Sequence, residues 1–263
     1  MIRNVNLSEI DFSRLTDDVP LLLLLVASSF VESGANMYTR NLLAHFTDDL
    51  EVAAWLKGQW EPEELEHGRA LHRYVAHAWP EFDWQRAFDR FIADYSDVCQ
   101  REALEPRHGL EMAARCIVET GTAALYRAIY RYVEEPALRQ IVGDIANDEI
   151  GHYKHFYRYF RKYQRQERNS RISILAVLMR RSIEFRSEDA DFGLRHAYDE
   201  RCRSGGNPEF GLDELKRRVS GLIKNNLPVG MAVKMWIKPL RLPTTAARIA
   251  QRLAPMLVQR LVF

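Results

Sequence analysis

The sequence has 263 residues, of which 47% are hydrophobic and 28% are charged, as is usual for a globular chain with a sizeable core. Its formal net charge of +1 gives no reason to expect a polyanionic partner such as nucleic acid for the chain as a whole. Cys99, Cys116 and Cys202 are an odd set without a C-x-x-C pair, so we predict no disulfide framework and a reducing, cytoplasmic compartment.

The first strongly apolar stretch, residues 21–27, is too short to cross a bilayer and has no basic leader before it. We therefore interpret it as the start of a buried helix over residues 20–46, capped by Asp17 or Asp18, with Pro20 near the first helical position. Glu32 is the one ionisable residue on the apolar face of this predicted helix.

A second helix is predicted over residues 50–78, with Glu64 and His67 on its apolar side. Pro62 lies inside this segment and should kink the helix or mark a restart. A third helix, over residues 84–104, carries inward-facing aromatic and apolar residues and no residue of ligand type among them, so we interpret it as a crossover. These inward residues are Phe88, Phe91, Ile92 and Tyr95.

Two further long helices are predicted, over residues 106–133 with Glu119 and over residues 136–163 with Glu149 and His152. Helices of ~27 residues extend about 40 Å, so the acidic candidates lie near the middle of each one. A carboxylate in the middle of a packed helical core is unfavourable unless something compensates its charge.

The last hundred residues differ in character from the rest of the chain. A helix over residues 172–185 and a loop over residues 204–208 are predicted, and from Leu212 onward there are ten Lys or Arg but only two acidic residues. We divide the chain into residues 1–165 and a helical extension, 166–263, whose basic amphipathic part begins at about residue 212. This part could bind an acidic acyl-carrier protein or an anionic membrane surface, or it could pack its apolar side on the core. Nucleic acid is not expected, because Trp236 is the only aromatic residue before Phe263 in this part and offers little surface for base stacking.

The strongest signal is a duplicated pattern of a glutamate followed about thirty residues later by Glu-x-x-His. Positions i and i+3 of a helix share a face, so each pair can point at one ion. Carboxylates with imidazole suit iron or manganese, and this set is typical of a di-iron carboxylate helical bundle. The symmetry predicts that Glu64 and Glu149 bridge two metal ions. The remaining candidates form one terminal pair, Glu32 with His67, and another, Glu119 with His152.

Four segments resemble the soluble acyl-carrier-protein desaturases of the ferritin-like di-iron superfamily. GQWEPEELEHGRAL is similar to their W-x-x-EE-x-x-HG segment and Asp148-Glu149-x-x-His152 to their second motif, while ESGANMYTRNLL and VETGTAALYR resemble their other two ligand helices. The resemblance covers residues 20–163. It implies an all-α, ferritin-like four-helix bundle with a crossover helix. It also implies a catalytic threonine near the O₂ side, matched by Thr122, and an outer carboxylate that orients a ligand histidine, matched by Asp148. A helix threonine bonded to its own backbone and a solvated acid are the alternatives for these two residues.

These observations predict an O₂-dependent di-iron oxidase that desaturates or hydroxylates an acyl chain, with two iron ions, an external electron-donor protein and a homodimeric state. One alternative is a di-iron N-oxygenase, in which His155 could add a ligand, although a surface histidine is the simpler interpretation. Others are a ferritin-like ferroxidase and a metal-free helical scaffold with a membrane-binding tail.

Overall fold

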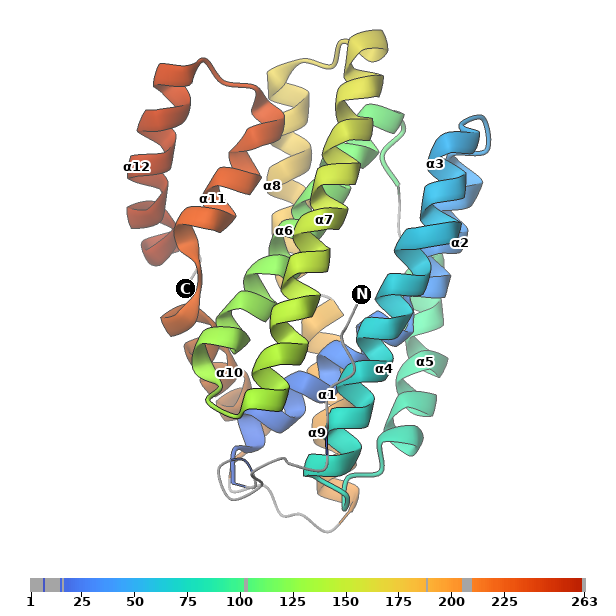
Figure 1. Ribbon diagram of the computed structural model, residues 1–263, viewed down its shortest axis with the longest axis vertical. Helices are drawn as coiled ribbons and strands as arrows, with labels where there is room; N and C mark the ends of the chain where they lie inside the picture. Colours follow the sequence, from blue (N-terminus) through green and yellow to red (C-terminus); the bar gives the residue numbers. More distant parts are fainter. Residues whose placement is uncertain are drawn as a thin grey trace.

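The computed structural model describes residues 7, 15, 17–101, 104–187, 189–204 and 210–261. Every long regular element within these residues is a helix, so the all-α prediction is confirmed for the part of the chain that is described. Figure 1 shows α6 and α7 side by side at the centre, with α3 and α4 in one run on one side and α11 and α12 at the opposite edge.

The predicted first helix consists of two helices, α1 (Val19–Ser33) and α2 (Ala35–His45). Asp18 caps α1 by accepting a hydrogen bond from the backbone N–H of Leu21 at 3.0 Å, and Pro20 lies in the first turn, as expected. The prediction of one unbroken helix over residues 20–46 was wrong at Gly34, where the helical pattern is interrupted. This interruption falls two residues after Glu32.

The second predicted helix is also composite. It begins as α3 (Leu50–Trp55), passes through a π-helical segment (Leu56–Trp60) and continues as α4 (Glu61–Ala78). Pro62 lies in the first turn of α4, directly after the π-helical segment, and the helical run continues through it without a break. The sequence pattern does not indicate the π-helical segment, a rare conformation in which the chain carries an extra residue per turn.

The other helices follow the predicted order. α5 (Trp84–Arg101) buries Phe91 and Tyr95, and α6 (His108–Tyr132) is followed by α7 (Pro136–Glu167). α7 runs four residues beyond its predicted end at Tyr163. The C-terminal region forms α8 (Arg171–Ser187), α9 (Asp189–Arg203), α10 (Leu212–Asn226), α11 (Val229–Ile237), a 3₁₀ turn (Lys238–Leu240) and α12 (Thr244–Leu261).

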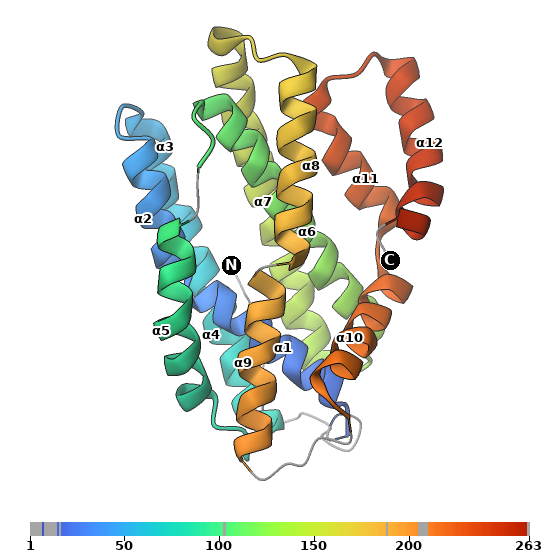
Figure 2. The same ribbon diagram turned by 180° about the vertical axis from the view of Figure 1, so that it is seen from behind.

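The four helical runs that carry the candidate ligands pack in two pairs, α1 with α4 and α6 with α7, and α4 also contacts α7. α5 lies outside the first pair, against α1, α2 and α4. Figure 2 shows α5, α8 and α9 from the opposite side; α8 packs on α6, and α9 packs on α1 and α5. The C-terminal helices therefore cover both pairs.

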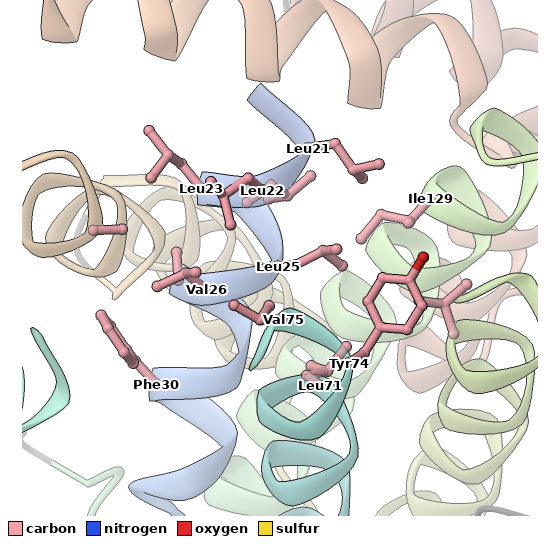
Figure 3. Packing of buried hydrophobic residues seen from close by; sticks show 14 of the residues in the cluster. Leu21, Leu22, Leu23, Leu25, Val26, Phe30, Leu71, Tyr74, Val75 and Ile129 are labelled. Atoms are coloured by element: carbon pink, nitrogen blue, oxygen red, sulfur yellow. The ribbon is translucent and has the colours of Figure 1, made fainter. Parts of the chain in front are cut away.

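The apolar core is divided into two clusters. One contains the leucines of α1 together with Leu71, Tyr74 and Ile129, which Figure 3 shows meeting between α1, α4 and α6. The other surrounds Trp60 and Phe156. Along each of the four runs, the first cluster lies to one side of the candidate ligands and the second to the other, so the ligands form a polar layer between two apolar regions.

The stretch Val19–His45 is long and apolar enough, by length and composition alone, to cross a membrane. In this structure 72% of its most apolar window is buried inside the protein. A core helix of a globular protein passes the same test, and the burial of the whole run from Leu21 to Phe30 is what the sequence interpretation requires of a buried helix.

Within the basic tail, α10 and α11 bury apolar side chains against the rest of the protein. α10 buries Leu215, Val219 and Leu222, and α10 and α11 both pack on α6. Several cations of the tail are paired within the chain, because Lys216 contacts Asp191 while Arg217 and Arg218 contact Glu214 at 2.6 and 2.8 Å. These contacts reduce the charge that α10 offers to a partner.

Candidate metal centre

The structure brings all six predicted ligands together. Glu32 comes from α1, Glu64 and His67 from α4, Glu119 from α6, and Glu149 and His152 from α7, and each of these residues is at most 8% exposed. Their ligand atoms form two groups, within each of which all atoms lie within 4.8 Å of one another. The first group is Glu32, Glu64, His67 and Glu149, and the second is Glu64, Glu119, Glu149 and His152.

The imidazoles define the centre of each group. In the first, Nδ1 of His67 lies 3.1 Å from Oε1 of Glu149 and 3.7 Å from Oε2 of Glu32. In the second, Nδ1 of His152 lies 2.9 Å from Oε1 of Glu64 and 3.6 Å from Oε2 of Glu119. Glu64 and Glu149 belong to both groups, and these are the two residues that the sequence symmetry predicts as bridges.

One buried atom of each of the six side chains makes no hydrogen bond, and it is the atom that faces its group. The imidazole–carboxylate contacts given above, at 2.9 to 3.7 Å, offset only part of the hydration that these atoms have lost. Buried polar atoms without partners are rare because each one loses its hydration without compensation. Six such atoms converging from four helices fit a pair of cations, because a cation can be coordinated by all of them. The atoms are Oε2 of Glu32, Oε1 of Glu64, Nδ1 of His67, Oε2 of Glu119, Oε1 of Glu149 and Nδ1 of His152.

The second nitrogen of each histidine contacts an outer carboxylate. Nε2 of His67 lies 3.4 Å from Oδ2 of Asp148, and Nε2 of His152 lies 2.8 Å from Oε2 of Glu63. Such a contact fixes which nitrogen of a histidine faces a metal and strengthens it as a ligand. The arrangement is reciprocal, since the acid that precedes each Glu-x-x-His motif holds the histidine of the other motif.

From the sequence this role is predicted for Asp148, and no role is predicted for Glu63. The missed signal was its position, because Glu63 stands directly before Glu64 as Asp148 stands before Glu149. The hydrogen bond from His152 holds the pKa of Glu63 below its usual range, so Glu63 is ionised and able to accept it.

Burial and crowding perturb the carboxyl groups of the cluster. Burial raises the pKa of Glu119 to about 8, and the charge of Glu149 adds to the shift. Burial also raises the pKa of Glu64 well above its usual value. Burial opposes ionisation of Glu149 too, but contacts with His152 and His67 outweigh it and hold its pKa well below the usual value. Without a cation, the cluster therefore retains protons at neutral pH, and a cation must displace them.

Two hydroxyl groups contact candidate ligands. Thr122 donates from Oγ1 to Oε2 of Glu149 at 2.6 Å, in addition to weaker contacts with the backbone of its own helix at 3.3 Å. The phenol of Tyr126, fully buried on the next turn of α6, donates to Oε1 of Glu32. Sequence reasoning missed Tyr126, although its place seven residues after Glu119 puts it on the same helix face.

His155 lies outside both groups. Its ring stacks on Trp55, with 4.9 Å between the ring centres and 9° between the planes. His155 is therefore half-buried and not on the surface, which differs from the simpler interpretation. Its buried Nδ1 has no hydrogen-bond partner, but His155 belongs to neither group of candidate ligands.

No protein-family model, curated protein or solved structure matches this chain. The functional argument therefore depends on the geometry of the cluster and on the duplicated order of its residues. What the described residues show directly is a buried group of glutamates and histidines that could hold a metal.

Proposed function

We propose that the four ligand-bearing runs form a ferritin-like four-helix bundle around two iron ions, and that the protein is an O₂-dependent oxidase acting on an acyl chain. The observation that carries the proposal is the convergence of six buried atoms without hydrogen-bond partners, one from each predicted ligand. Iron in this environment would supply the reduction of O₂ and the oxidising power needed to attack an unactivated carbon.

The protein residues have separate roles in this proposal. Glu64 and Glu149 would hold both ions, and each of the two histidines would hold one ion in the orientation that Glu63 and Asp148 set. Thr122 donates a hydrogen bond to Oε2 of Glu149, which leaves Oε1 to face the centre. The apolar clusters on both sides of this layer exclude water from the reacting groups.

The proposal is tested by loading the protein with Fe(II) without oxygen, counting iron per chain, and then adding O₂ with a panel of acyl thioesters and free acids. We expect two iron ions per chain and a product that has lost two hydrogens or gained one oxygen atom. Glu149→Ala should lose most of the iron because it removes a ligand of both groups. Full iron content in that variant would contradict the assignment, while O₂ consumption without any organic product would favour a ferroxidase.

A further inference from the structure

The two halves of the ligand set differ in the regularity of their helices. α6 and α7 run without interruption, whereas in the other half α1 is separated from α2 at Gly34 and α3 is joined to α4 through the π-helical segment Leu56–Trp60. Both irregularities are close to candidate ligands, two residues after Glu32 and four residues before Glu64. π-helical turns inside α-helices are frequent at functional sites, which directs attention to the space between them.

A pocket of about 270 Å³ opens between these two irregular segments. Asn36, Arg40 and Leu43 line it from α2, Lys57 lines it from the π-helical segment, and Glu61 lines it from the first turn of α4. Asn36 follows Glu32 by four residues and Glu61 precedes Glu64 by three. Each wall of the pocket therefore lies about one helical turn, along its own helical segment, from a candidate ligand.

The charges in the pocket leave one cation uncompensated. Lys57 forms an ion pair with the buried carboxylate of Glu61 at 2.7 Å. Arg40 is exposed and makes no hydrogen bond or ion pair with any residue that the structure describes. Leu43 adds an apolar wall beside this guanidinium. A free guanidinium next to an apolar surface suits a molecule with an acid group and a hydrocarbon part, because arginine can donate two parallel hydrogen bonds to a carboxylate.

The duplicated sequence supplies an internal comparison. Arg127 follows Glu119 by eight residues, as Arg40 follows Glu32, and Tyr130 has the place that Leu43 has in the first half. Arg127 donates to Asn147 and lies over the ring of Tyr130, 5.8 Å from its centre. Arg127 is thus engaged by contacts with Asn147 and Tyr130, whereas its counterpart Arg40 lines a pocket.

We propose that this pocket binds a small carboxylate, with its acid group on Arg40 and the rest of the molecule directed toward Glu32 and Glu64. The pocket, at about 270 Å³, has room for a small acid with a short hydrocarbon part. The inference rests on the proposed function in treating this acid as the molecule that is oxidised, and it narrows the substrate class from acyl chains in general to short free acids.

The test is calorimetric binding of octanoate to the Fe(II)-loaded protein without oxygen, with octylamine as the charge control. Arg40→Gln should weaken octanoate binding at least about tenfold, since a hydrogen-bonded charged group is lost, while Arg127→Gln should leave it within about twofold. Leu43→Trp, which fills the pocket, should also weaken it. Equal affinity of wild type and Arg40→Gln, equally tight binding of octylamine, or no binding of octanoate to the wild type would overturn the proposal.

Iron content, measured on the same samples, separates this inference from the proposed function. Arg40 is no candidate ligand, so Arg40→Gln should retain the full iron content of the wild type. If the protein binds two irons but its octanoate binding does not depend on Arg40, the pocket proposal is contradicted and the proposed metal site is not. Octanoate binding that depends on Arg40 in a protein that takes up no iron would remove the oxidase and keep the pocket.

Discussion

Gly68, the residue after His67, lies where α4 packs closely against α1 at Ser33. A Cβ atom at this position would be 2.7 Å from the backbone nitrogen of Ser33 and 3.1 Å from its Cα. Ordinary contacts of this kind begin at about 3.4 Å, so Gly68→Ala must separate the two backbones locally by about 0.7 Å. Since Ser33 is the neighbour of Glu32, this shift would displace Glu32 relative to His67.

The expected destabilisation is the overpacking term of about 1–3 kcal/mol, offset by the gain of up to about 1 kcal/mol that alanine brings to any helix interior. Gly221→Ala in α10 isolates the two contributions, because no atom lies within 4 Å of its added Cβ and only the helix gain applies. The difference between the two variants in the free energy of unfolding, measured with urea, should therefore be about 1–3 kcal/mol.

Iron content should fall in Gly68→Ala and stay unchanged in Gly221→Ala. A Gly68→Ala protein as stable as Gly221→Ala, with two irons per chain, would refute the argument that close backbone contact between α1 and α4 fixes the first group of ligands.

Four further outcomes are expected. Glu64→Ala should lose most of the iron by elemental analysis, because Glu64 belongs to both groups; retention of two ions would remove its bridging role. Glu63→Ala should keep the site but weaken metal affinity about 10–100-fold in a competition assay with a chelator, and unchanged affinity would make its contact with His152 incidental. Thr122→Val should retain iron and reduce the product formed per O₂ consumed; unchanged coupling would leave Thr122 without a chemical role. Glu119, with a pKa of about 8, is protonated at neutral pH and must ionise to bind a cation. His67 and His152 must also lose a proton, because contacts with carboxylates outweigh burial and raise their pKa values. Metal affinity should therefore rise as the pH is raised through about 8, with proton release seen as a buffer-dependent binding enthalpy; an affinity independent of pH would contradict this.

The sequence predicted the helices and all six clustered residues because both depend on local rules. Apolar periodicity set the long helices, and the i, i+3 spacing put each glutamate and its histidine on one face. The cap at Asp18 and the helix start at Pro136 were also predictable, since they involve neighbours in the chain.

What the sequence did not predict depends on the relative placement of helices. The contact of Glu63 with His152 joins α4 to α7, and that of Tyr126 with Glu32 joins α6 to α1. Neither can be derived from the spacing within one helix. The π-helical segment before α4 was missed for a related reason, because an extra residue in one turn leaves the apolar pattern on either side almost unchanged.

The division of the core by a polar layer has a consequence for the order in which parts of the protein unfold. Without cations, the layer joins two well-packed apolar bodies through crowded carboxylates, and each body can open as a cooperative unit with its own free energy. Bound ions would connect all four helical runs at that layer and merge the two units into one. Backbone amide exchange should then slow most upon metal uptake near the middle of α6 and α7, and least at their outer turns.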